Sequence, residues 1–143
     1  MLIILALHAA ATWIMTGVIW FVQVVHYPLL AKIGVNFTEY ESEHVRRTMP
    51  LAGSAMIAEL GFAAWVALRP PSGLPLWMPY TGLALVACLW ASTFFIMVPL
   101  HESLSREQSL PNVRRLVRNN WWRTVMWTAR GGLAAAMIVK VAG

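Results

Sequence analysis

A basic, tryptophan-rich stretch from Asn119 to Arg130 carries the side chains most suited to chemistry. If this stretch is helical, four side chains at positions i, i+3, i+7 and i+10 share one face: Asn120, Arg123, Trp127 and Arg130. A membrane-crossing helix needs about 20 residues. A crossing that begins near Trp121 therefore places Arg130 on the order of 13 Å inside the bilayer. A guanidinium at that depth requires a carboxylate, a cavity or a bound ligand.

Glu59 is the acidic residue whose expected depth matches that of Arg130. It lies roughly 13 Å inside the apolar segment that begins at Met49 and Pro50. Small residues on the same face, such as Ala52 and Ala63, permit close helix packing there. An ionisable residue inside a membrane indicates a functional site. The alternative is a structural ion pair between Glu59 and Arg130 that fixes the order of the helices, and the two interpretations are compatible.

Three histidines suggest a redox cofactor as an alternative to a simple binding pocket. His26 and His101 are expected at the same ends of their helices and could be the axial ligands of one haem b, with arginines binding the propionates. A metal ion held by His26, His44, His101 and Glu59 is a second alternative. His8 lies about 27 Å from His26 along the same helix. We therefore expect His8 to be a polar residue of the interface or of a helix contact, tolerant of substitution.

The composition indicates which elements must position these residues. Of the 143 residues, 59% are hydrophobic and only 12% are charged, whereas soluble domains carry about 25% charged residues. The basic residues are concentrated in two segments between apolar runs, which fits membrane topology and predicts no nucleic-acid partner. The single cysteine, Cys88, excludes a disulfide framework. The first apolar run lacks a basic n-region and a cleavage site, so we expect a retained helix and not a signal peptide.

The apolar runs predict an all-α protein with one domain, residues 1–143, folded as an up-down four-helix bundle. The expected helices are residues 2–30, 50–68, 77–100 and 121–142, with a short amphipathic helix at 37–48. Because lysines and arginines are concentrated in the first and third connections, both termini are expected on the outer side of the membrane. The sequence thus predicts a multi-pass protein of the inner cell membrane.

Local signals suggest where the helices start and end. Thr38 and Glu41 fit a capping box for the amphipathic helix. Pro50 suits the first turn of the second long helix. Pro99 is expected to kink or end the third helix, and Pro111 to start a helix that continues into the fourth.

The third connection is basic and leads into an aromatic doublet. Arg114, Arg115 and Arg118 indicate a solvated or phospholipid-facing surface more than a ligand site. Trp121 and Trp122 are expected at the membrane interface as part of an aromatic belt.

The bundle order brings most polar residues into the cytoplasmic half. Polar groups within a membrane accumulate where a ligand or a hydrophilic path requires them, and bundles place such sites between facing helices. We therefore predict a pocket that opens to the cytoplasmic side and binds a small hydrophobic, aromatic or quinone-like molecule. Its candidate residues are His26, Tyr27, Tyr40, His44, Glu59, Thr93, His101, Asn120, Arg123, Trp127 and Arg130.

Three short motifs resemble a known family. They are Met49-Pro50 before an alanine-rich helix, the stretch Met97 to Leu104, and Asn120-Trp121-Trp122-Arg123-Thr124. Together these resemble the small four-helix membrane proteins of the anthrone-oxygenase-like group. The sequence departs from the family where Leu100-His101 stands in place of Thr-Asn.

The resemblance implies an oxidoreductase that removes an acidic proton from an aromatic substrate before reaction with dioxygen. His26, His44 or His101 is then the general base. Arg123 and Arg130 stabilise the developing enolate or phenolate, while Glu59 holds an arginine or relays the proton. A different class remains open, a non-catalytic subunit of a larger membrane complex, and a homo-oligomer is compatible with either class.

Overall fold

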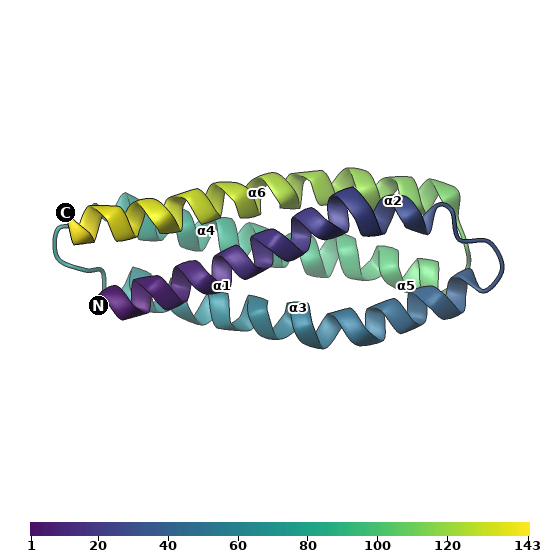
Figure 1. Cartoon of the computed structure of the whole chain (residues 1–143), viewed down its shortest axis with the longest axis horizontal. Coiled ribbons are helices and arrows are strands. Elements are labelled where there is room, and N and C mark those ends of the chain that lie inside the picture. Colours follow the sequence, from purple (N-terminus) through teal and green to yellow (C-terminus); the bar gives the residue numbers. More distant parts are fainter.

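The computed structural model describes all 143 residues, and every regular element is helical. The first long helix consists of α1 (Leu2–Phe21), the π-helical turn η1 (Val22–His26) and α2 (Tyr27–Leu30), and the second is α3 (Phe37–Leu68). The third consists of α4 (Trp77–Ser92), the π-helical turn η2 (Thr93–Met97) and α5 (Val98–Arg106), and the fourth is α6 (Leu110–Ala142). Figure 1 shows four long helices in one bundle, with both termini at the same end. We call this end the terminal end and the opposite one the distal end.

All four long helices are long and apolar enough to cross a membrane. Large apolar side chains cover the outside of the bundle: Ile3, Phe95 and Trp122 are 75%, 80% and 71% exposed. The buried residues, in contrast, include ten polar or charged side chains. Apolar residues outside and polar residues inside are expected where lipid is the surrounding solvent. The fold is therefore that of a multi-pass membrane protein.

Both π-helical turns lie directly before a proline. η1 ends two residues before Pro28, and η2 ends two residues before Pro99. A proline in a helix lacks an N–H donor and its ring crowds the carbonyl four residues earlier. A wider turn at that point relieves the crowding and lets the helix continue. The predicted end of the helix at Pro99 is therefore wrong, because the third helix runs on to Arg106.

The predicted break between residues 48 and 50 is also wrong. The amphipathic helix and the second long helix are one helix, α3, and Pro50 lies in its interior and not in its first turn. The helix begins after Asn36, which has a left-handed backbone with φ of 70°. No capping box forms there, because the carboxylate of Glu41 is fully buried inside the bundle.

The start of the fourth long helix was predicted correctly from Pro111. α6 begins at Leu110 and runs without a break to Ala142. Ser109 caps it by accepting a hydrogen bond from the backbone N–H of Asn112 at 3.4 Å.

Three apolar clusters follow one another along the bundle. The terminal cluster contains Leu5, Val66, Leu74, Met78 and Met137. The middle cluster contains Met15, Ile19, Met56, Leu89 and Trp127. The distal cluster contains Val22, Tyr27, Leu30, Phe37, Met97, Leu100, Leu104, Val113 and Leu116. Most of the buried polar side chains lie between successive clusters and form two separate layers, whereas Glu41 lies at the level of the distal cluster.

Candidate functional site

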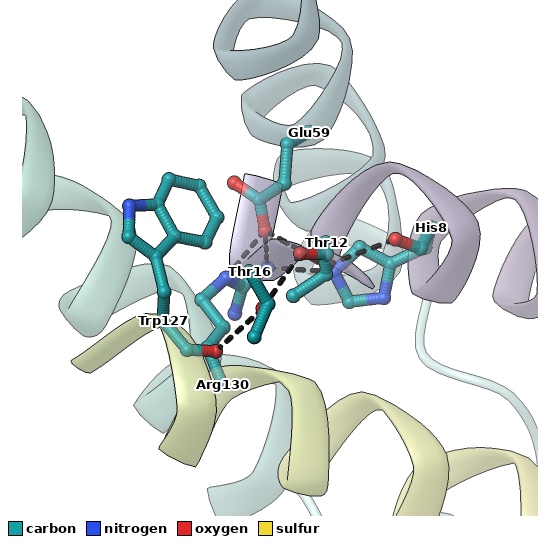
Figure 2. Close-up of polar contacts among 6 residues, drawn as sticks. All are labelled: His8, Thr12, Thr16, Glu59, Trp127 and Arg130. Atoms are coloured by element: carbon teal, nitrogen blue, oxygen red, sulfur yellow. Dashed lines mark hydrogen bonds and ion pairs between the residues drawn. The ribbon is translucent and has the colours of Figure 1, made fainter. Parts of the chain in front are cut away.

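The polar layer nearer the terminal end contains a buried ion pair. Arg130 on α6 donates hydrogen bonds to the carboxylate of Glu59 on α3, as their matching depths predicted. Nη2 of Arg130 also lies 2.6 Å from Nε2 of His8, and Thr12 donates to Glu59 Oε1 at 3.3 Å. Figure 2 shows these side chains converging from three helices. All four are at most 1% exposed, so the ion pair is isolated from both water and lipid.

The position of this pair corrects two expectations. Because α3 starts at Phe37, Glu59 lies 22 residues, or about 33 Å, from the distal end of that helix. Glu59 and Arg130 thus belong to the terminal half with His8, and not to the half that holds His26 and His101. His8 is a residue of a helix contact, as expected, but its direct contact with Arg130 argues against tolerance of substitution.

The pair is also tightly enclosed. Gly82 on α4 faces Arg130, and a Cβ atom at that position would lie 2.6 Å from Nη1 of the guanidinium. Neither Glu59 nor Arg130 lines the main pocket of the protein. The geometry therefore favours the structural interpretation, in which the pair fixes how α1, α3 and α6 pack.

The main pocket has a volume of about 480 Å³, within the usual range for small-molecule sites. It lies between α3 and the third long helix, and α1 provides part of its wall. Its walls are mostly apolar, with Met15, Ile19, Met56, Trp90 and Phe94 among them. Five of the predicted pocket residues line it: Tyr27, His44, Thr93, His101 and Arg123. Six do not: His26, Tyr40, Glu59, Asn120, Trp127 and Arg130.

Arg123 is the buried charged side chain of this pocket, whose other charged lining residues, Glu102 and Arg106, are exposed. It is only 5% exposed, and Nη1 donates to Thr93 Oγ1 at 2.6 Å and to the carbonyl of Leu89 at 3.1 Å. Its Nε has no hydrogen-bond partner, and the side chain forms no ion pair with any carboxylate. A buried cation without an anion is costly. A ligand oxygen with negative charge would offset that cost.

The other two polar residues of this face of α6 connect helices. Asn120 donates to the side-chain oxygen of Gln23 on η1 at 2.9 Å. Trp127 packs in the middle cluster, and its backbone carbonyl accepts a hydrogen bond from Thr16 at 3.1 Å. These contacts hold α6 against the first long helix and so position Arg123.

A hydrogen-bonded chain reaches the pocket from the distal end. Nδ1 of His101 lies 2.5 Å from the carboxylate of Glu41, and Nε2 lies 2.9 Å from the hydroxyl of Tyr27. Glu41 is fully buried, and the rings of Tyr27 and His101 line the pocket. Sequence reasoning assigned Glu41 to a capping box and missed this role. The signal that could have found it is its spacing, one turn from both Phe37 and His44 on the inward face of α3.

His44 is the histidine with a free ring nitrogen at the pocket. Its Nδ1 lies 3.1 Å from the hydroxyl of Thr48, and its Nε2 has no partner within the chain. Its ring stacks on that of His26 with centroids 4.1 Å apart, and the ring of Tyr40 also stacks on His26, at 6.2 Å. His26 and Tyr40 thus support His44 from outside the pocket. This arrangement favours His44 over His26 as a base for a bound molecule.

The cofactor alternatives do not fit these contacts. No three His, Cys, Asp or Glu side chains are grouped so that they could hold a metal ion. Glu59 in particular belongs to the separate ion pair with Arg130. A haem ligated by His26 and His101 would have to displace Glu41 or Tyr27, because both ring nitrogens of His101 are already bonded.

No protein-family model, curated protein or solved structure matches this chain.

Proposed function

We propose that the pocket binds a small hydrophobic, aromatic or quinone-like molecule through an oxygen that carries or develops negative charge. The observation that carries this proposal is Arg123, a guanidinium buried at the wall of a mostly apolar pocket without a carboxylate partner. Apolar walls suit a ring system, while one buried cation without a carboxylate partner suits one acidic or polarised oxygen.

The proposed membrane topology determines on which side of the membrane the pocket lies. In an up-down order with both termini outside, the distal end faces the cytoplasm of a cell whose inner membrane holds the protein. The concentration of Lys and Arg in the first and third connections supports this orientation. The pocket then lies in the cytoplasmic half of the bundle.

The chain from Glu41 to Tyr27 supports proton transfer as the accompanying chemistry. A phenol or activated C–H group that ionises against Arg123 releases a proton. Either Nε2 of His44 accepts it directly, or Tyr27 passes a proton to His101. The carboxylate of Glu41 stabilises the imidazolium that results. We propose that the electron pair left on the substrate forms a C–O bond to dioxygen and that the resulting peroxide anion takes back a proton from the base. Loss of water from the hydroperoxide, with cleavage of its O–O bond and of the remaining C–H bond on the same carbon, gives a ketone, which is the oxidation that the anthrone-oxygenase-like resemblance implies.

The test compares an acidic ligand with an apolar analogue on protein purified in detergent. Anthrone should raise the thermal unfolding midpoint, whereas anthracene, which has the same ring system without the oxygen, should not. Arg123→Met should abolish the shift, and the exposed Arg114→Gln on the same helix serves as the matched control.

A second readout keeps this test decisive if ligand binding is weak. Because Arg123 lacks an anionic partner, Arg123→Met should unfold at the same or a higher temperature than the wild type without ligand. A large loss of stability in the ligand-free variant would show that Arg123 is structural and would overturn the proposal. An oxygen electrode separates oxidation from binding alone: anthrone that binds without oxygen uptake identifies a binding subunit and not an oxidase.

A further inference from the structure

A second cavity, of about 430 Å³, lies between the third long helix and α6 and shares no residue with the main pocket. Apolar side chains from η2 and the start of α5 form one part of it, and polar side chains from α5 and α6 form the other. Its lining residues are Phe95, Ile96, Pro99, Leu100, Ser103, Asn112, Arg115, Arg118 and Asn119.

The polar part of this cavity carries positive charge and no negative charge, which suits an anion. Arg115 and Arg118 are both exposed and form no ion pair within the chain. No Asp or Glu lines the cavity. Asn112 is held by a hydrogen bond to Ser103 at 3.0 Å, and Asn119 by one to the backbone carbonyl of Arg115 at 2.9 Å. Two arginines, together with the amide and hydroxyl groups of the same cavity, can donate hydrogen bonds to the oxygens of a phosphate group.

The apolar part of the cavity continues onto the lipid-facing surface. Phe95 and Ile96 are 80% and 39% exposed on η2, in the third membrane-spanning helix. One turn along α6 from Arg118, Trp121 and Trp122 are 47% and 71% exposed and fit an aromatic belt at the membrane interface. The cavity therefore spans the boundary at which a phospholipid headgroup meets its acyl chains.

We infer that this cavity is a binding site for an anionic phospholipid. Arg115 and Arg118 bind the headgroup phosphate, and an acyl chain lies along Phe95 and Ile96. The charge of the cavity selects an anionic headgroup over a zwitterionic one, because the phosphate of a zwitterionic lipid is already paired with its own ammonium group. A free phosphate could satisfy the arginines, but it would leave the apolar part of the cavity without a partner.

The experiment measures retention of phosphatidylglycerol by native mass spectrometry, using the full chain in a neutral detergent. The wild type should bind phosphatidylglycerol more tightly than phosphatidylcholine. Arg115→Gln with Arg118→Gln should weaken phosphatidylglycerol binding about tenfold or more, since hydrogen bonds to charged groups are lost. Arg114→Gln, which removes an exposed arginine outside the cavity, should change it by less than about twofold. Unchanged unfolding midpoints in phosphatidylcholine nanodiscs would show that the variants remain folded.

Three results would overturn the inference. Equal binding of the two lipids by the wild type would remove the selectivity, and equal losses in Arg114→Gln and the double variant would indicate general surface electrostatics. Stabilisation by inorganic phosphate as large as that by phosphatidylglycerol would make the cavity an anion site and not a lipid site. The anthrone response of the main pocket should persist in the double variant, so the two sites can fail independently.

Discussion

Glu59→Gln tests whether the buried ion pair organises the bundle. The variant keeps the shape of the side chain but leaves the guanidinium of Arg130 without its counter-ion, at a position that is 1% exposed. Removing one partner of a buried pair costs about 3–5 kcal/mol. At about 3 °C per kcal/mol for a chain of this length, the unfolding midpoint should fall by about 9–15 °C.

The assay is thermal unfolding in detergent, followed by the far-ultraviolet circular dichroism of the helices. Glu43→Gln is the matched control, because Glu43 lies on the same helix and also pairs with arginines, at 2.7 Å from Arg46 and 2.5 Å from Arg47, but on the exposed surface. That substitution should leave the midpoint almost unchanged, since exposed ion pairs contribute little.

The double variant Glu59→Gln with Arg130→Gln tests whether the two side chains stabilise the protein as a pair or independently. Removing both charges should restore part of the lost stability, because neither charge is then buried alone. An unfolding midpoint of Glu59→Gln within about 3 °C of the wild type would refute the reasoning. So would additive losses in the double variant, which would mean that the two side chains do not depend on each other.

The other predictions concern residues that contact the pair or the pocket. His8→Ala should destabilise the protein by about 1.5–3 kcal/mol in the same assay, because the hydrogen bond to Arg130 is lost, and an unchanged midpoint would contradict that contact. Gly82→Ala should cost about 1–3 kcal/mol by displacing the guanidinium of Arg130, whereas Gly61→Ala, with open space around its Cβ, should be neutral or stabilising. Tyr27→Phe should keep anthrone binding and, if the proton passes through Tyr27, reduce oxygen uptake by about 10²-fold or more; full oxygen uptake would exclude this path and leave direct transfer to His44.

The helices and one long-range contact could be predicted from the sequence. Four apolar runs long enough to cross a membrane gave the number of helices, since hydrophobic length is the main signal in lipid. Glu59 and Arg130 could be paired because a charge inside a membrane has few acceptable surroundings, so matching depth is informative.

Glu41 shows where sequence reasoning failed and why. Thr38 and Glu41 satisfy the local pattern of a capping box. In the structure, the carboxylate of Glu41 pairs instead with His101, which lies sixty positions away in the chain. Local patterns carry no information about which helix will lie opposite. Because the second long helix was predicted to begin at Pro50, Glu59 was also assigned to the wrong half of the bundle.

Arg123 and Arg130 differ in how the chain balances their buried charge. The two arginines lie seven residues apart on one face of α6, and both are at least 95% buried. Arg130 has a carboxylate, a histidine and a closely packed glycine around it, so its charge is balanced within the chain. Arg123 has only the oxygens of Thr93 and Leu89, which are neutral. Because a chain that needed only to satisfy a buried arginine could do so as it does at Arg130, the missing anion at Arg123 is best explained by a ligand that supplies it.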